Sequence, residues 1–200
     1  MPSSIHTRVA FFIDAQNLYH SAKHLHSARV NFAELIRAVA GERTVIRALA
    51  YVVKSEGFVD AISAGERSFF EALKNAGIEL RQKDLQVFAG GAKKADWDVG
   101  LAVDAIRTAS SYDIAVLATG DGDFVPLIEY LRWGLGKQVE VASFGKATSA
   151  KLKEIADRFT DLDALPRVRI TKRREKSSAR RAPPASSSGT SSGKQTARKQ

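Results

Sequence analysis

The sequence predicts an α/β fold in three layers, with a central, mostly parallel β-sheet and helices on both of its faces. Between residues 7 and 165, segments typical of strands alternate with segments typical of helices, which is the pattern of strand–helix–strand units. Several strand segments lack polar alternation, as expected for strands that are covered on both faces. A length of 200 residues with 44% apolar residues suits one compact domain and a tail.

Five segments rich in β-branched and aromatic residues predict the strands of this sheet. In such sheets, ligands bind beyond the carboxyl ends of the strands, near the point where the strand order reverses. Polar side chains that directly follow a strand are therefore candidate functional groups. The predicted strands are residues 8–13, 45–53, 78–85, 114–119 and 139–144.

Helices are expected between and after these strands. Asn31 is a suitable N-cap for the segment FAELIRAVAG, and Gly41 is a suitable stop. Trp133 is expected to pack near a helix end, and Phe69 and Phe70 are interpreted as core residues rather than surfaces for base stacking. The predicted helices are residues 16–26, 31–40, 66–76, 98–109, 124–133 and 148–157.

The segment VAFFIDAQNLYHSA, residues 9–22, ends a buried strand on Asp14 and carries Asn17 three residues later. Asp14 stands where a functional side chain is expected. An aspartate at this position also suits the N-cap of a helix that begins near Gln16. This segment alone does not decide between the two roles.

A second acidic segment, LATGDGDFVPLI, places Asp121 and Asp123 after an apolar strand, with Gly120 and Gly122 interleaved. Glycine lets the backbone turn tightly, so two carboxylates that are two residues apart can converge. An ordinary capped turn explains one of these aspartates but not both. The pair therefore favours a functional role.

A third acidic segment, KKADWDVGLAVDAI, begins a helix at Asp96 or Asp98. Acids at a helix N-terminus often only compensate the helix dipole. We expect the buried stripe of this helix to consist of Val99, Ala102, Val103 and Ile106. Asp104 would then lie roughly opposite to the stripe, either exposed to solvent or at the edge of the site.

If the first and fourth strands are neighbours, Asp14, Asp98, Asp121 and Asp123 form one cluster. Crowded carboxylates raise one another's pKa, and such a cluster persists most readily where a hard cation neutralises it. Ligand sets made only of oxygen select Mg²⁺ or Mn²⁺ over zinc. Such an ion lowers the pKa of a water molecule, which can then attack a phosphorus atom in line.

The charge of the chain is concentrated at its C-terminal end. Residues 166–200 hold 11 Lys and Arg and one Glu, a net charge of +10, whereas residues 1–165 hold 20 basic and 21 acidic residues, a net charge of −1. The terminal segment is rich in Ser, Pro and Gly, and we expect disorder after about Thr171. It is either a solubilising tail or an arm that binds nucleic acid without sequence preference.

Other features restrict the class of protein. The chain has no cysteine, which excludes disulfides and thiolate metal sites. No segment approaches the roughly 20 apolar residues of a membrane helix, and the N-terminus lacks the apolar region of a signal peptide. We therefore expect a cytoplasmic protein without a membrane partner. The sequence leaves the oligomeric state open, and a homodimer is compatible with it.

Three segments, FFIDAQNLYHSA, KKADWDVGLAVDAI and TGDGDFVPLIEYLRWGLGKQVEV, together resemble the NYN domain family in its bacterial LabA-like branch. That family is similar in fold to PIN-domain nucleases. The resemblance covers about residues 7–162. It implies a PIN-like domain within residues 1–165, followed by the basic tail of residues 166–200, and it implies a metal-dependent ribonuclease. Thr119 stands where the family often has serine, and it keeps the hydroxyl group.

The resemblance also assigns residues to the site. The family's first-strand acid and amide match Asp14 and Asn17, its helix-start acid matches Asp98, and its paired acids match Asp121 and Asp123. We expect Asp14, Asp98 and Asp121 to hold the metal, and Asp123 to complete the shell or position the attacking water. Asn17 would orient a phosphate group or a water molecule.

Further residues are candidates for contacts with the substrate. Lys93 and Lys94 precede the acidic helix and are either phosphate contacts or solvated loop residues. Trp97 lies beside the acids and is a candidate for stacking on a base. Asp104 matches an acidic position of the family whose role is less clear.

Three histidines, His20, His24 and His26, lie in the first predicted helix. The i, i+4 pair His20 and His24 could bind a transition metal or contact a phosphate group, but plain helix surface is the leading interpretation.

The leading hypothesis is a Mg²⁺- or Mn²⁺-dependent endoribonuclease that acts on RNA. A second hypothesis is a regulatory protein that binds nucleic acid and has a weak or inactive acidic site. A third, a phosphatase with an aspartyl nucleophile, needs a second acid two residues after the first, and Gln16 occupies that position.

Overall fold

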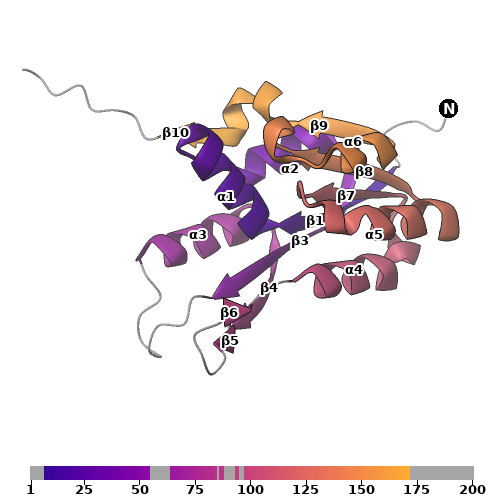
Figure 1. Ribbon diagram of the computed structural model, residues 1–200, viewed down its shortest axis with the longest axis horizontal. Helices are drawn as coiled ribbons and strands as arrows, with labels where there is room; N and C mark the ends of the chain where they lie inside the picture. The colour runs from indigo at the N-terminus through magenta and orange to yellow at the C-terminus, as the bar shows by residue number, and fades with distance from the viewer. Residues whose placement is uncertain (1–6, 55–63, 85, 88–92, 95–96, 172–200) are drawn as a thin grey trace, which may run out of the picture.

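The computed structural model describes residues 7–54, 64–84, 86–87, 93–94 and 97–171. Its centre is a six-stranded sheet in the order β4-β3-β1-β7-β8-β9, and every neighbouring pair is parallel (Figure 1). The predicted parallel sheet is thus confirmed. The strands are β1 (Arg8–Asp14), β3 (Thr44–Lys54), β4 (Glu79–Asp84), β7 (Ile114–Ala118), β8 (Gln138–Ser143) and β9 (Arg158–Asp161).

Two separate apolar clusters lie on the two faces of the sheet, and β1 contributes to both. Phe11 is buried in one cluster and the adjacent Phe12 in the other, because successive side chains of a strand point to opposite faces. This explains why the strand segments show no polar alternation: both faces of the central strands are covered.

The helices cover the two faces in the order in which they occur along the chain. Leu18, Leu35 and Leu73 pack in the first cluster, and they come from α1 (Ala15–His26), α2 (Phe32–Ala40) and α3 (Ala64–Asn75). Leu101, Ile128 and Leu152 pack in the second cluster, and they come from α4 (Asp98–Arg107), α5 (Val125–Glu129) and α6 (Ala150–Ile155). The predicted three-layer arrangement is therefore confirmed.

The chain also forms smaller elements outside the central sheet. The short strand β2 (Ala28–Val30) pairs antiparallel with β10 (Arg169–Thr171), and β5 (Gln86–Val87) pairs antiparallel with β6 (Lys93–Lys94). A π-helical turn, η4 (Tyr130–Gly134), extends α5. The 3₁₀ turns are η2 (Ala109–Ser111), η3 (Gly122–Phe124), η5 (Gly145–Ala147), η6 (Leu162–Ala164) and η7 (Pro166–Val168).

The predicted buried stripe of α4 is wrong. Val99, Val103 and Ile106 are 73%, 52% and 40% exposed, and Ala102 is half-buried, whereas Leu101 and Asp104 are buried. The helix is rotated about its axis relative to the prediction. Leu101 packs in the second cluster, and the buried Asp104 accepts hydrogen bonds from side chains of β3 and β4.

The expected packing of Trp133 is also wrong, since its side chain is 70% exposed on η4. None of the helices in the described part of the chain has the length and apolar character needed to cross a bilayer.

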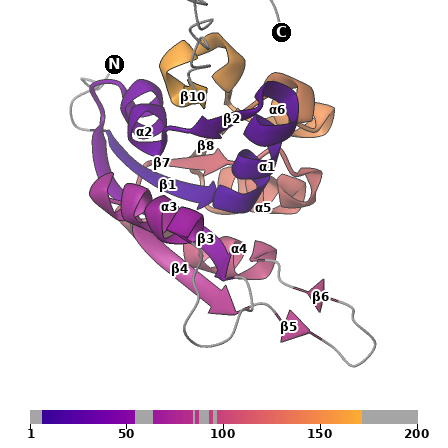
Figure 2. The same ribbon diagram turned by 90° about the vertical axis from the view of Figure 1, so that its left-hand side faces the viewer.

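The strand order reverses between β1 and β7. From β1 the chain proceeds to β3 and β4 on one side of the sheet, and it then returns to β7, β8 and β9 on the other side (Figure 2). Because β1 and β7 are parallel neighbours, with Ile13 paired to Ala118, their carboxyl ends lie next to each other. Ligands of open α/β sheets bind at this place.

Candidate metal centre

Asp14 takes the capping role that its sequence position allowed, and its functional role stays a prediction. It is the N-cap of α1, and its Oδ1 accepts a hydrogen bond from the backbone N–H of Asn17 at 3.0 Å. Its Oδ2 accepts a hydrogen bond from the hydroxyl of Thr119 at 3.3 Å. One carboxylate oxygen therefore fixes the start of the helix, and the other faces the end of β7.

The turn after β7 is held by side chains rather than by regular structure. The buried Thr119 hydroxyl accepts a hydrogen bond from the backbone N–H of Asp121 at 3.2 Å. Asp121 Oδ1 in turn accepts from the N–H of Asp123 at 3.0 Å, which caps η3. Asn17 Oδ1 accepts from the N–H of Gly120 at 3.0 Å. The first turn of α1 and the turn after β7 are thus fixed to each other.

Gly120 is required by close packing at this turn. A Cβ atom built on it would lie 2.5 Å from the carbonyl oxygen of Ala147 and 3.1 Å from Ser143 Oγ. The first of these is a backbone atom, which cannot rotate away. Any larger residue would push the turn that carries Asp121 out of place.

Asp98, Asp121 and Asp123, here called the aspartate trio, converge in front of this turn. Each offers a carboxylate oxygen, and these three oxygens lie within 4.8 Å of one another. Asp98 arrives from the first turn of α4, which contacts η3. Asp98 and Asp121 are half-buried and Asp123 is exposed. Three hard oxygen donors at this separation fit Mg²⁺ or Mn²⁺ better than a softer ion.

Asp14 lies beside the aspartate trio but is not part of it. Burial raises the pKa of Asp14, and the charge of Asp121 raises it further, whereas the hydrogen bonds from Asn17 and Thr119 oppose the increase. A carboxyl group in this position holds its proton more tightly than an exposed aspartate does. Of the four predicted metal ligands, the structure brings three together. The Asp14 carboxylate is linked through the Thr119 hydroxyl to the backbone N–H of Asp121.

Asp104 is neither exposed nor at the aspartate trio. It is buried, and its Oδ2 accepts hydrogen bonds from the Tyr51 hydroxyl and from Arg81 Nε, both at 3.1 Å. Its Oδ1 accepts from Arg107 Nη2 at 2.5 Å. Burial and the adjacent Asp104 charge raise the pKa of Tyr51 strongly. The prediction that Asp104 lies opposite the buried face is therefore wrong, and its partners are protein groups.

The other candidate residues differ in position. Trp97 is half-buried, its indole N–H donates to the carbonyl of Val52 at 2.9 Å, and its ring packs against Tyr51 with centroids 5.6 Å apart. Lys93 and Lys94 form β6, and their side chains lie outside the described part of the structure. Substrate contacts by these three residues stay predictions.

The histidines divide into two environments. The rings of His20 and His24 are exposed on α1 and stacked, with centroids 6.2 Å apart. His26 is half-buried, with Nε2 2.5 Å from Asp163 Oδ1 and Nδ1 3.2 Å from Arg169 Nη1. The exposure of His20 and His24 agrees with their interpretation as plain helix surface. His26 is half-buried and paired, and it is therefore not plain helix surface.

Thr119 contributes to this site in a role that the sequence did not predict. Its hydroxyl bridges Asp14 and Asp121. A signal was present, because a hydroxyl residue stands two positions before the first of the paired aspartates. That spacing alone does not identify the acceptor, which belongs to a strand 105 residues earlier in the chain.

Comparison with known proteins gives matches in sequence and in structure. The sequence model of the NYN domain matches residues 8–163. The protein "Low amplitude and bright protein LabA" of Synechococcus elongatus is 33% identical over 106 residues, and the match covers 49% of this chain and 55% of that protein. The chain thus spans about half the length of this relative. A crystal structure of a Vibrio parahaemolyticus protein of unknown function is 29% identical, with a TM-score of 0.72, over 82% of this chain and 97% of the other.

Proposed function

The chain belongs to the NYN domain family, and on this premise we propose that it is a ribonuclease that hydrolyses RNA phosphodiester bonds with the help of Mg²⁺ or Mn²⁺. The family implies a nuclease-type function. The observation that carries the proposal is the convergence of the aspartate trio within 4.8 Å, at the place where the strand order reverses. A protein retains three crowded carboxylates most readily where a cation neutralises them.

The aspartate trio is the assigned ligand set for the ion. When bound, a divalent cation there would acidify a water molecule and stabilise the charge that develops on phosphate oxygens. In the hydrolysis the water oxygen bonds to phosphorus, the ester P–O bond breaks, and the leaving oxygen takes up a proton. Asp123 is the most exposed member of the trio and is therefore the member assigned to face the substrate.

Asp14 and Asn17 support this centre from the first turn of α1. Asp14 adds negative charge behind the trio and receives the hydrogen bond that fixes Thr119. The hydrogen bond from the N–H of Gly120 to Asn17 Oδ1 orients this amide, and its Nδ2 group is assigned to donate to a phosphate oxygen. Both residues also orient the turn that carries Asp121, Asp14 through Thr119 and Asn17 through Gly120.

The basic tail is assigned a separate, sequence-independent role. With a net charge of +10 between residues 166 and 200, it would release counterions from the phosphate backbone and would bind RNA and other polyanions. This electrostatic contribution raises the affinity for RNA without selecting a sequence. It weakens steeply as the salt concentration increases.

The positive charge is concentrated in the tail, apart from the acidic centre, and this favours a second candidate function. If the acidic centre is weak or inactive, the tail still binds nucleic acid, and the protein would act as a regulatory binding protein. Its binding would then be independent of the aspartate trio and of divalent ions.

The test is to incubate the full chain and a chain lacking residues 172–200, the part of the basic tail that follows β10, with labelled single-stranded RNA, in Mn²⁺, in Mg²⁺ and in chelator. The nuclease proposal expects cleavage only with metal, and slower cleavage at low RNA concentration without the tail. Binding without cleavage, lost when the tail is removed, supports the regulatory protein. Turnover of a small phosphomonoester with intact RNA contradicts both.

A further inference from the structure

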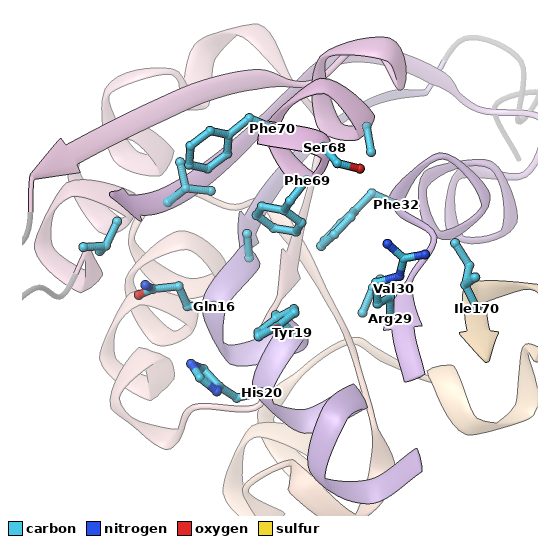
Figure 3. A pocket seen from close by; sticks show the side chains of 14 residues that line it. Gln16, Tyr19, His20, Arg29, Val30, Phe32, Ser68, Phe69, Phe70 and Ile170 are labelled. Atoms are coloured by element: carbon cyan, nitrogen blue, oxygen red, sulfur yellow. The ribbon is translucent and has the colours of Figure 1, made fainter. Parts of the chain in front are cut away.

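A cavity of about 670 Å³ opens beside α1, on the face of the sheet that α1, α2 and α3 cover (Figure 3). Its walls include Tyr19 and His20 from α1, Arg29 from β2, Phe32 from α2 and Phe69 from α3. The volume lies within the range of about 300–1,000 Å³ that is usual for ligand pockets. None of the described residues that line it is acidic, which distinguishes it from the neighbouring metal centre.

The same helix borders the cavity and the metal centre. Gln16, Tyr19 and His20 line the cavity, whereas Asn17, on the same turns of α1, contacts Gly120 after β7. Tyr19 follows the N-cap Asp14 by five residues, which is about 7.5 Å along the helix axis. Stacked nucleotides rise about 3.4 Å each along a strand, so two to three linked nucleotides span this distance.

The aromatic side chains in the wall are suited to stacking. The rings of Tyr19 and Phe69 lie edge to face with centroids 6.1 Å apart, and those of Phe32 and Phe69 lie 5.8 Å apart. Tyr19 and Phe69 are only half-buried, unlike the buried Phe70. The sequence-based interpretation as core holds for Phe70, which is buried in the first cluster, and Phe69 packs against that cluster. Both rings also line the cavity (Figure 3). Aromatic rings stack on every base, because every base has a π-face.

Two basic side chains lie next to the aromatic wall. Arg29 lines the cavity and is exposed, and the Lys23 ammonium lies 5.8 Å from the centre of the Tyr19 ring. Basic side chains together with exposed aromatic rings are the combination with which proteins bind single-stranded nucleic acid. The amide of Gln16 and the hydroxyl of Ser68 add groups that can hydrogen-bond to the edge of a base.

We propose that this cavity is a base-binding subsite, which takes an unpaired nucleobase from the same RNA strand whose phosphodiester bond lies at the aspartate trio. The proposal rests on the proposed function and adds to it. It assigns single-stranded RNA as the substrate class, because a base within a duplex cannot enter the cavity. It also assigns Tyr19 and Phe69 as binding residues that take no part in the chemistry.

The experiment compares two probes on the full chain in chelator, where cleavage is off: a short oligouridylate, and an abasic ribose–phosphate chain of equal length. Both carry the same phosphates, so the contribution of the basic tail cancels in the ratio of their dissociation constants. We expect the wild-type protein to prefer the oligouridylate by about 5- to 150-fold, the usual range for stacking one base.

Three variants locate this preference. Tyr19→Leu is expected to bring the ratio towards one while the affinity for the abasic probe stays constant. Arg29→Gln is expected to weaken the binding of both probes alike. The matched control is Tyr130→Leu, a tyrosine that is 49% exposed on η4 and does not line the cavity, and it should leave the ratio at the wild-type value. Equal wild-type affinities, or a preference that Tyr19→Leu does not change, would overturn the proposal.

A second measurement covers the case in which Tyr19→Leu does not fold. Oligouridylate that carries 5-iodouridine is cross-linked to the wild-type chain by light, and the attached residue is identified by mass spectrometry. Attachment to Tyr19 or Phe69 supports the subsite, and attachment confined to residues 172–200 contradicts it.

Cleavage is measured separately with Mn²⁺, so that the two proposals can fail independently. Cleavage without a base preference removes the subsite and leaves the nuclease. A base preference that depends on Tyr19, in a protein that does not cleave RNA with any divalent ion, removes the nuclease and leaves a site for single-stranded RNA.

Discussion

The hydroxyl of Thr119 donates a hydrogen bond to the carboxylate of Asp14 at 3.3 Å, across the boundary between β7 and β1. The same oxygen accepts a hydrogen bond from the backbone of Asp121 at 3.2 Å. One neutral group therefore fixes two acidic residues relative to each other without cancelling either charge. The negative charge of the site stays available to a cation.

Thr119→Val removes the hydroxyl while it keeps the shape of the side chain. The partly buried N–H of Asp121 loses its partner, which should lower the free energy of unfolding by about 1 kcal/mol. The pKa of Asp14 should rise further, because the Thr119 hydrogen bond normally lowers it. We expect kcat/KM for RNA to fall on the order of 10–100-fold, as for other groups that orient metal ligands. The control Thr119→Ser should remain close to wild type, and equal behaviour of the two variants would contradict this role.

Gly120→Ala should destabilise the fold by about 1–3 kcal/mol, because the new Cβ meets the carbonyl oxygen of Ala147 at 2.5 Å. Gly122→Ala is the matched control. Its nearest neighbour is the Ser149 hydroxyl at 3.0 Å, which belongs to a side chain that can rotate. Urea unfolding of both variants measures the difference. A Gly120→Ala protein as stable as Gly122→Ala would show that the turn is not tightly packed.

Asp14→Asn should stabilise the metal-free protein near neutral pH. Burial raises the pKa of Asp14 above its ordinary value of 3.8, so the folded state binds this proton more tightly than the unfolded chain does. Stability is then lost as the pH rises from the unfolded pKa to the folded pKa, and it stays lower above that interval. Asparagine carries no charge and still caps a helix, so we expect a gain of about 0.5–2 kcal/mol.

The measurement for Asp14→Asn is urea unfolding in chelator, near neutral pH and at about pH 4. The gain should shrink at the lower pH, because there the unfolded wild-type chain also takes up the proton. A gain that grows on acidification would contradict the assigned direction of the pKa shift.

Mn²⁺ should raise the thermal midpoint of the wild-type protein. An ion at a hundred times its dissociation constant stabilises the folded state by about 2.7 kcal/mol. Asp98→Asn and Asp123→Asn should abolish most of this increase. Asp104→Asn is the control: it loses charged partners in Arg81 and Arg107 and should melt earlier, yet keep the increase. A metal response lost in Asp104→Asn and kept in Asp98→Asn would contradict the aspartate trio as the ligand set.

The sequence was sufficient to predict the parallel sheet and the strand-end position of Asp14 and Asp121. Strands that are apolar on both faces, each followed by an amphipathic segment, allow few other arrangements. The sheet order then places the acids together, because carboxyl ends of parallel neighbours meet at one edge. The short strand β9 was not predicted, since RFTD carries little apolar signal.

The rotation of α4 could not be predicted from its own residues. Val99, Leu101, Val103 and Ile106 place apolar side chains around much of the helix, so the periodicity does not select one face. The choice depends on Asp104, whose partners Tyr51 and Arg81 come from strands more than 20 residues earlier in the chain. The cavity beside α1 was missed for the same reason, because its wall joins α1, β2, α2 and α3.

The most direct measurement is cleavage of single-stranded RNA by the wild type, by Asp121→Asn and by Asp113→Asn, each with Mn²⁺ and with chelator. Asp113 pairs with Arg8 at 2.8 Å, outside the aspartate trio, so its variant controls for the loss of one aspartate charge. A metal centre at the aspartate trio predicts metal-dependent cleavage by the wild type and Asp113→Asn, and a loss of at least about 100-fold in Asp121→Asn. Cleavage by Asp121→Asn at the wild-type rate, or in chelator, would contradict it.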